Sequence, residues 1–576
     1  MKKRKIKKLK NKKVEYLIVF LAMPILLFFL YHIGIKETMT IHIASDEFGY
    51  WTGAANILGY DWSNSASSNG YYSFGYGIVL APLLLIKNSI NSYKIAIYIN
   101  ILFIIFSYFI TIFWERRIEV GKTLVEQAII SFIVNCYAGL FFYTKLTLAE
   151  CLLWMLFALC VSMVAEYEKK EEKVYFFGSF IIGFIMMYVH MRAIGIIVSL
   201  LITYFIYFGM IHKKDLKFFS QIVILLALGF ILFKYFKNDL KNNQYILLTT
   251  NFNEISGQTH KIVELLQKEG IVRFILNCIG RIWYLGISSI MIIYVGLEEC
   301  LCSIKKLYKE RNCRIIFPVF ILGAFGLAIM ISALYMIDIQ NGRRDYLFYG
   351  RYSEYIIAPL LLLGIKRLFS GNQSLKRIVI YIMIQIIIGI IVVKTIIKYK
   401  MQDCLDASIP AIYYWLNKTD YNNDTYIFLT MLFIVVFIGL FILCSKEKCR
   451  IISSILICSC WLYMGYNSYK ISDTHKHDED YYAVFDAIEQ HSKDNNMEIL
   501  YYFDENDVSN HYYYIGIDRI QFMLKDKKIE FLQAETEEIK KNSIVITRGK
   551  SQCNSLLRDK CEIILENREF NVYEYK

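Results

Sequence analysis

Long apolar runs separated by short charged segments occupy most of the chain. A helix needs about 20 apolar residues to cross the hydrocarbon core of a bilayer, and on this length the sequence predicts thirteen membrane-spanning helices. Their expected limits are 15–35, 94–114, 123–142, 147–166, 173–190, 193–211, 219–236, 283–303, 314–336, 354–369, 376–396, 426–444 and 450–466. The first run is long and has no small-residue cleavage site, so we expect an anchor helix that is not removed. The pattern predicts a polytopic α-helical membrane protein.

The charges between the runs predict which side of the membrane each loop faces. Residues 1–13 carry nine Lys and Arg and no acid, and residues 1–14 are expected to form a cytoplasmic basic tail. Every second loop is short and basic, whereas the segments 36–93, 237–282 and 397–425 are long and less basic. Thirteen crossings from a cytoplasmic N-terminus place residues 467–576 outside the cell. Abundant Ile, Lys and Asn with only 5 Pro are typical of an AT-rich bacterial genome, so we expect a bacterial plasma membrane.

Composition narrows the function classes. The chain has 576 residues, of which 56% are hydrophobic, and its mean hydropathy is +0.39, which excludes a string of soluble domains. The net charge is 64 minus 51, or +13, but the basic loops and tail account for it. We therefore expect contact with membrane lipid and no nucleic-acid partner.

The last hundred residues have a different composition. From about Tyr469 short β-type runs such as 499–503 and 543–547 alternate with helical stretches such as 480–490. These predict a small extracytoplasmic α/β domain over 467–576, following a multi-span domain over 15–466. Its role is open between a module that faces the acceptor and a structural one.

The first outer segment, 36–93, contains the most informative residues. Asp46 and Glu47 follow a natural N-cap and precede Tyr50 and Trp51, which predicts a short helix at the outer membrane surface. Asp46 and Tyr50 are one turn apart, whereas Glu47 lies about 100° round the helix. An ordinary capped amphipathic helix explains the pattern too, but an acidic pair beside a membrane is costly without a partner or a function.

This arrangement resembles a known family. A basic tail, one span and then Asp46-Glu47-x-x-Tyr50 is similar to the GT-C superfamily of membrane glycosyltransferases, in particular the protein O-mannosyltransferase and lipid A aminoarabinose transferase group. Further similar stretches, within residues 1–370, are the Pro82 segment, Thr147–Glu150, Tyr188–Arg192 and Tyr349–Tyr352. The Lys-Pro-Pro element of the aminoarabinose transferases is absent.

The resemblance implies a GT-C-like fold and an outer-face activity. The donor would be a polyprenyl-phosphate sugar, carrying a hexose or pentose, and the acceptor a cell-envelope glycan, lipid or protein. Asp46 would be the base, which also fits its place at a helix start. Glu47 would orient the acceptor or pair with an arginine, and Tyr50 would lie in the substrate site.

Arginines on the outer side are the candidate phosphate ligands, because a guanidinium gives two parallel charge-assisted bonds. Arg343, Arg344 and Arg351 cluster beside aromatic residues, and Arg192 stands at an outer helix end. Snorkelling anchors remain an alternative. Glu150 either forms a wall of the site or makes a local ion pair with Lys145. Arg273 and Arg281 are expected to be interfacial anchors.

No cofactor is indicated with certainty. The chain has no Walker-type loop, dinucleotide-binding turn or redox Cys pair. His475, His477, Asp478 and Asp480 cluster, but their spacing fits no defined zinc site, so no metal ligand is assigned and a divalent metal stays possible. Cys553 and Cys561 could pair.

Two other functions remain open. A transporter or flippase would need charges near the middle of the spans. A polymerase of lipid-linked saccharides would use a diphosphate donor.

Overall fold

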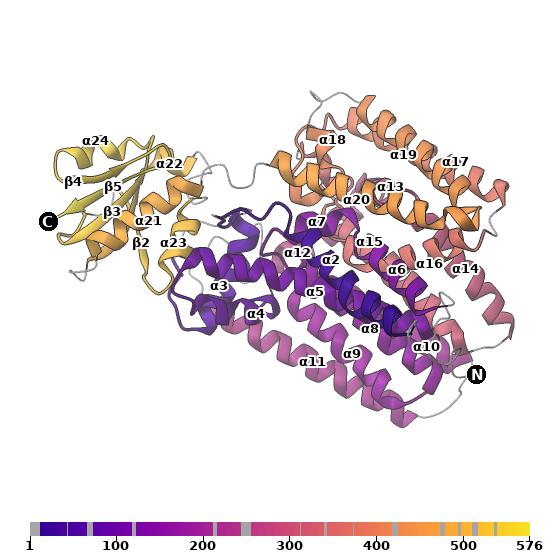
Figure 1. Ribbon diagram of the computed structural model, residues 1–576. Coiled ribbons are helices and arrows are strands. Elements are labelled where there is room, and N and C mark those ends of the chain that lie inside the picture. Colours follow the sequence, from indigo (N-terminus) through magenta and orange to yellow (C-terminus); the bar gives the residue numbers. More distant parts are fainter. Residues whose placement is uncertain are drawn as a thin grey trace.

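The architecture comes from a computed structural model. It describes residues 12–37, 39–42, 44–65, 73–117, 123–210, 216–243, 255–310, 313–338, 342–371, 374–417, 424–472, 478–492, 497–509, 516–534 and 538–576. Most of them form a helical bundle, and a five-stranded sheet lies at one end of it (Figure 1). The basic tail up to residue 11 is outside the described residues.

Nine helices among the described residues are long and apolar enough to cross a membrane. They are Lys12–His32, Ser89–Glu115, Glu150–Lys170, Met191–Gly209, Gly270–Ser288, Ile316–Tyr335, Leu375–Lys398, Asp424–Cys444 and Glu447–Ser472. In Figure 1 they contain η1 (Ile18–Ala22), α2 (Met23–His32), α5 (Ser89–Arg117), α8 (Glu150–Lys170), η2 (Met191–Ala193), α10 (Ile194–Met210), α13 (Gly270–Ser288), α15 (Ile316–Tyr335), α17 (Leu375–Lys398), α19 (Asp424–Cys444), η8 (Glu447–Cys449) and α20 (Arg450–Ser472). The prediction of a multi-pass α-helical membrane protein is confirmed.

The remaining helices complete the bundle. They are α3 (Ala44–Ile57), α4 (Gly75–Leu84), α6 (Leu124–Val134), α7 (Ala138–Tyr143), α9 (Lys173–Val189), α11 (Leu216–Asn243), α12 (Ile255–Leu266), α14 (Ile292–Glu310), η4 (Cys313–Ile315), η5 (Arg344–Tyr346), η6 (Glu354–Ile356), α16 (Ala358–Phe369), η7 (Asp406–Ser408) and α18 (Tyr413–Asn417). Four of them, α4, α6, α9 and the 220–236 part of α11, are apolar but below the length for a span. The predicted count of thirteen is therefore not confirmed.

The predicted span 283–303 is wrong. Helix α13 ends at Ser288 and α14 begins at Ile292, and between them Ile290 and Met291 have φ values of 54° and 58°. Non-glycine residues seldom adopt this left-handed conformation, and it ends a right-handed helix. The sequence did not reveal the break because apolar residues continue through it.

Arg281 lies inside the bundle and not at a membrane surface. It is fully buried in α13, and its guanidinium donates to the hydroxyl and carbonyl oxygens of Ser332 at 2.6 and 2.8 Å and to the Asn277 carbonyl at 3.1 Å. Arg273 is also buried. The expectation of an interfacial anchor is thus wrong for Arg281, which instead connects α13 to α15.

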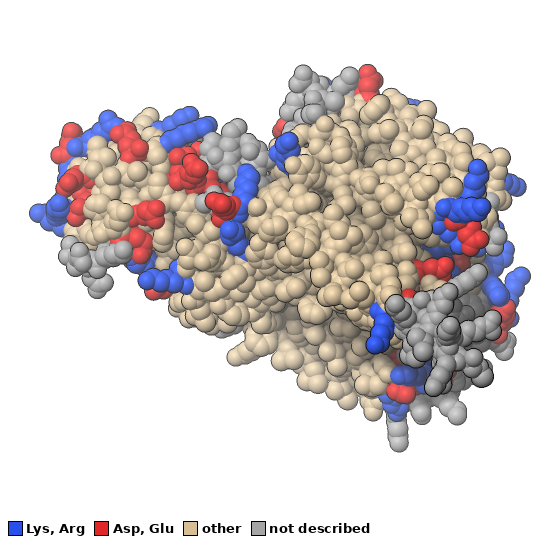
Figure 2. All heavy atoms as spheres, in the orientation of Figure 1, with Lys and Arg blue, Asp and Glu red and all other residues tan. Residues whose placement is uncertain are grey.

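The charged surface lies at the two ends of the molecule. Figure 2 shows Lys, Arg, Asp and Glu gathered over the C-terminal domain and over the opposite end of the bundle, with a mostly uncharged face between them. The segment that follows the first helix meets the C-terminal domain, because the Tyr482 hydroxyl of that domain donates to the Met39 carbonyl at 3.0 Å. Lys12 is therefore at the far end of that helix.

The C-terminal unit is the predicted α/β domain. Its strands β1 (Glu498–Phe503), β2 (Ile529–Gln533), β3 (Ser543–Arg548), β4 (Glu562–Glu566) and β5 (Phe570–Tyr575) form a sheet in the order β2-β1-β3-β5-β4. Strand β1 is parallel to β2 and β3, and β5 is antiparallel to β3 and β4. Its helices are α21 (Asp478–Ser492), α22 (Glu505–Ser509), α23 (Ile517–Leu524) and α24 (Cys553–Arg558). Strand β1 lies between β2 and β3, and its residues 499–503 are all buried, as expected for a nearly continuous apolar run.

Helix α23 docks the C-terminal domain on the first outer segment. The Phe522 ring lies 4.8 Å from Trp51 of α3 and 6.3 Å from Tyr93 of α5, between ring centroids. The carbonyl of Lys525 accepts from the Trp62 indole at 2.5 Å, and the Lys525 amine donates to the Ile86 carbonyl. The domain is therefore packed against the segment that carries Asp46 and Glu47.

Replacing Phe522 by Ala should loosen this docking. Truncation of a buried Phe costs about 3 to 5 kcal/mol, and part of that packing is against Trp51 and Tyr93. We expect limited proteolysis to release the C-terminal domain at least about tenfold faster, and Lys525→Ala to act in the same direction. Leu556→Ala, at an exposed position of α24, is the control, and an equal release rate from it would contradict the docking role.

Candidate active site

Helix α3 places its two acids in different directions. Asp46 and Glu47 are both in its first turn, where the positive end of the helix dipole stabilises a carboxylate. The Asp46 side chain is 25% exposed, whereas Glu47 is completely buried. Asp46 is therefore the acid of the pair that a substrate can reach.

Glu47 fastens α3 to the bundle. Its Oε1 accepts from the Tyr93 hydroxyl at 2.6 Å and from the backbone N–H and hydroxyl of Thr147 at 2.6 and 2.7 Å. Its Oε2 accepts from the backbone N–H of His42 at 2.8 Å. These bonds satisfy the buried carboxylate and fix the start of α3 next to the start of α8. The geometry thus favours a supporting role for Glu47 over the predicted contact with an acceptor.

Arg351 brings two further candidates together. Its Nη1 binds Asp46 Oδ2, and its Nε binds Glu150 Oε1 at 2.5 Å. The arginine is 2% exposed; burial opposes its charge, but Glu150 and Asp46 hold the pKa of Arg351 above its usual range. Glu150 does not pair with Lys145, whose amine donates to the Tyr31 carbonyl. Three residues from distant parts of the sequence therefore form one charged cluster.

The backbone around Arg351 is held by the outer segment that contains η7. The N–H groups of Gly350 and Arg351 both donate to the Ser408 carbonyl, at 2.9 and 3.2 Å. A Cβ on Gly350 would come within 1.9 Å of the Tyr284 ring, so only glycine fits this approach. The direction of the guanidinium is consequently set by packing and not by the ion pairs alone.

Sequence reasoning missed Glu354, one turn after Arg351. It is 2% exposed and accepts hydroxyl hydrogen bonds from Tyr137 at 2.6 Å, Tyr143 at 2.6 Å and Tyr284 at 2.7 Å. Burial raises the pKa of Glu354. The hydrogen bonds from the three tyrosine hydroxyls lower this pKa, and the nearby Glu150 raises it further. The only signal in the sequence is an acid three residues after Arg351 at the entry to an apolar helix.

Arg192 is a buried cation in an aromatic setting. It is 9% exposed, its guanidinium lies over the ring of Tyr352 and 5.9 Å from that of Tyr335, and its Nη2 contacts His190. Among the described residues its Nε has no hydrogen-bond partner, and the ion pairs found there include none with Arg192. A buried guanidinium with an unused donor is suited to an anionic ligand.

Tyr50 lies within electrostatic range of both arginines. It is 1% exposed, and its ring meets Tyr76 edge-on at 5.3 Å. Burial and the charge of Glu150 raise the pKa of Tyr50, whereas Arg351 and Arg192 lower it. The charges of Asp46, Glu150, Arg192 and Arg351 all act on the Tyr50 hydroxyl. We call these four residues the outer charge cluster.

Arg343 and Arg344 have other contacts. Arg343 binds Asp345, with 3.1 Å from Nε to Oδ1, and lies over the Tyr346 ring at 4.6 Å. Arg344 donates to the Gln402 carbonyl at 2.6 Å and to the Tyr426 hydroxyl at 3.1 Å. The structure does not bring these two side chains to the outer charge cluster. Their contacts favour a role in fixing the 342–350 segment over the predicted binding of phosphate.

The candidate metal ligands lie in the C-terminal domain. Within the described ranges, one group of side chains could hold a metal ion: Asp504, Asp507 and Cys553. Asp504 and Asp507 each accept the other's backbone N–H, at 2.8 and 3.2 Å, which is the pattern of a capping box at the start of α22. Helix capping therefore explains the carboxylates. His475 and His477 lie outside the described residues, and Cys553 and Cys561 are both free thiols.

Comparisons with known proteins identify the fold. No family model and no curated protein sequence matches the chain. ArnT from Cupriavidus metallidurans, solved bound to undecaprenyl phosphate, is similar over 97% of both chains, with a TM-score of 0.51 and 11% identity. Its apo structure covers 98% of both chains, with a TM-score of 0.46 and 10% identity. The apo oligosaccharyltransferase of Archaeoglobus fulgidus covers 92% of this chain and 70% of its own, with a TM-score of 0.43 and 9% identity.

The likeness to ArnT, a lipid A aminoarabinose transferase, spans the helical bundle and the C-terminal domain alike, because the match covers 97% of this chain. At 11% identity it is a likeness of fold. This likeness agrees with the resemblance that the Asp46-Glu47-x-x-Tyr50 stretch indicated, and this chain has the fold of that transferase.

Proposed function

We propose that the chain is a membrane glycosyltransferase that moves a sugar from a polyprenyl-phosphate donor to a hydroxyl group of a cell-envelope glycan, lipid or protein. The outer charge cluster carries this proposal: its partly exposed carboxylate, Asp46, is bound by Arg351, and the same cluster includes the buried Arg192, whose Nε has no hydrogen-bond partner among the described residues. The fold supports the choice of donor, because the ArnT structure of this fold was solved with undecaprenyl phosphate.

The transfer needs a proton acceptor and a stabilised leaving group. The acceptor hydroxyl attacks the anomeric carbon of the sugar while the bond from that carbon to the phosphate oxygen breaks. Asp46 takes the hydroxyl proton, a role that requires hydrogen-bond reach of the acceptor. The polyprenyl phosphate leaves with an additional negative charge, which must be met by fixed cations.

Arg192 and Arg351 supply these cations in different ways. Arg351 already binds Asp46 and Glu150, so it organises the acids and adds positive potential. Arg192 can offer its Nε to a phosphate oxygen without breaking an ion pair seen among the described residues. The aromatic rings of Tyr335 and Tyr352 beside it exclude water and strengthen the interaction.

The orientation follows from the placement of the two ends. We propose a cytoplasmic tail over residues 1–14, a multi-span domain over 15–466 with its catalytic outer segment at 36–93, and an extracytoplasmic domain over 467–576 in a bacterial plasma membrane. The support is that Lys12 and the C-terminal domain lie at opposite ends of a helix long enough to cross the bilayer. The positive-inside rule assigns the basic end to the cytoplasm.

Asp46→Asn should abolish transfer. A general base contributes about 10²- to 10⁴-fold, and the amide keeps the shape of the side chain but cannot accept a proton. Membranes that contain the chain would be given undecaprenyl-phosphate sugars labelled in the sugar, and label in envelope material would be counted. Full transfer by the variant would remove Asp46 from the reaction.

The control acid is Asp61, in the same outer segment with a side chain that is 53% exposed. Its ion pair with Lys528 is a surface pair of small energy, so Asp61→Asn should keep full transfer. The same assay separates the alternative functions. Label that crosses vesicle membranes without a new glycosidic bond would indicate a flippase, and use of diphosphate-linked oligosaccharides alone would indicate a polymerase.

Arg192→Gln should weaken binding of the lipid phosphate. A hydrogen bond to a charged group contributes about 1.5 to 3 kcal/mol, or roughly 10- to 100-fold in affinity. Undecaprenyl phosphate can be titrated into the purified protein, which measures its Kd without knowledge of the sugar or acceptor. Arg343→Gln is the comparison, and we expect it to lower thermal stability with little change in Kd. A Kd that weakens in Arg343→Gln and stays unchanged in Arg192→Gln would instead indicate that the phosphate binds at the 343–345 segment.

An epitope tag after Lys576 should be accessible from outside. Protease added to intact spheroplasts is expected to remove the tag, whereas a tag before Met1 should be cut only after the membrane is opened. A protected C-terminal tag would place the outer charge cluster in the cytoplasm and contradict a donor on the outer face.

A further inference from the structure

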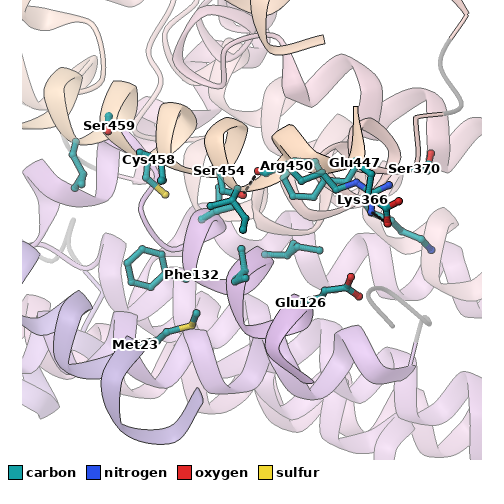
Figure 3. A pocket seen from close by; sticks show the side chains of 17 residues that line it. Met23, Glu126, Phe132, Lys366, Ser370, Glu447, Arg450, Ser454, Cys458 and Ser459 are labelled. Atoms are coloured by element: carbon teal, nitrogen blue, oxygen red, sulfur yellow. Dashed lines mark hydrogen bonds and ion pairs between the residues drawn. The ribbon is translucent and has the colours of Figure 1, made fainter. Parts of the chain in front are cut away.

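A groove lies at the end of the bundle away from the outer charge cluster. It has a volume of 840 Å³ and is lined by α6, α16, η8 and α20, together with Met23 of α2. Figure 3 shows Lys366, Glu447 and Arg450 together at one end of the groove and Met23 and Cys458 toward the other. The groove is thus amphipathic along its length.

The polar end has an unused cationic donor. Arg450 Nη1 lies 3.4 Å from Glu447 Oε1, a weak pair because the Glu447 side chain is 81% exposed. Arg450 Nε is buried and makes no hydrogen bond to any residue that the structure describes. Buried donors without an acceptor are rare in folded proteins. An anionic oxygen at this position would accept a hydrogen bond from Arg450 Nε.

The charged groups at this end include two cations that can bind an anion. Lys366 of α16 lines the groove together with Arg450. Of the two acids in the lining, Glu447 is mostly exposed, and Glu126 accepts the backbone N–H of Thr123 at 3.2 Å in the capping box of α6. The hydroxyl groups of Ser370 and Ser454 also line the groove but donate to the backbone carbonyls of Arg367 and Arg450. The side chains that would bind an oxyanion are therefore Lys366 and Arg450.

The length and openness of the groove fit a lipid. From Arg450 to Leu462 helix α20 rises about 18 Å, compared with roughly 15 Å for half of a bilayer core. The wall of α20 includes Ile451 and Ile455, which are 68% and 61% exposed, so the groove is open toward the membrane. Its apolar part would cover an acyl chain within one leaflet.

We propose that this groove binds one diacyl phospholipid of the leaflet opposite the outer charge cluster. The phosphate lies against Arg450 and Lys366, and one acyl chain runs along Phe132 and Ile133 of α6 and the facing side of α20. The lipid joins the start of α6 to α16 and α20, and this role is independent of the proposed sugar transfer.

The test uses the full chain purified in mild detergent and native mass spectrometry with added phosphatidylglycerol. We expect one bound lipid per chain, and the double variant Lys366→Ala/Arg450→Ala should reduce the bound fraction at least about tenfold. Diacylglycerol, which has the same chains but no phosphate, should not bind. Ser454→Trp, which fills the groove with both cations in place, should also prevent binding.

The matched control is Arg367→Ala. Arg367 is at the same end of α16 but outside the lining of the groove, and it binds Glu299 at 3.0 Å. It should retain phosphatidylglycerol like the unchanged chain. Equal lipid binding by all variants would overturn the site. Binding of undecaprenyl phosphate in place of phosphatidylglycerol, lost in the double variant, would overturn the choice of occupant.

Discussion

The ion pairs of the buried Arg351 are the interaction on which the outer end of the molecule depends. A guanidinium that is 2% exposed cannot keep its charge without close partners, because desolvation of an ion costs several kcal/mol. Its two partners come from α3 and from the first residue of α8. The charge therefore connects three segments that are far apart in the sequence, and loss of either acid would leave it only partly compensated.

The two acids that bind Arg351 differ in their exposure to solvent. Glu150 is nearly as buried as the arginine, with 4% of its side chain exposed, whereas Asp46 keeps 25%. Glu47 secures the same helix from its other side through Thr147 and Tyr93. The proposed chemistry uses the carboxylate that remains accessible, and the neighbouring acids hold its helix in place. Such division is common where a site must be both charged and rigid.

The sequence predicted most helices because apolar length alone determines them. The run 147–166 corresponds to Glu150–Lys170, and 376–396 to Leu375–Lys398. The span expected from apolar length differs from the structure at α13, where Arg273, Asn277 and Arg281 interrupt the apolar pattern although all three are buried. The partners of Asn277 and Arg281 are backbone carbonyls and Ser332, and a hydropathy window contains no information on contacts of that kind.

The site was predictable to the extent that its residues stand at helix ends or in a motif. Asp46, Glu150 and Arg351 were expected on the outer side and do meet. The ranking of Arg351 above Arg343 and Arg344 was not available, because it depends on Ser408, Gln402 and Tyr426, which lie about 60 to 80 residues further along the chain. Glu354 was missed for the same reason.

The docking of α23 also bears on how the protein is made. Trp62 and Lys525, which share a hydrogen bond, are 463 residues apart, and the backbone N–H of Thr40 donates to Asp478 over 438 residues. During synthesis the segment that carries Asp46 leaves the ribosome early, yet its packing partners in α23 are among the last residues to emerge. The nascent chain would accordingly hold an incompletely packed outer segment until translation has almost finished.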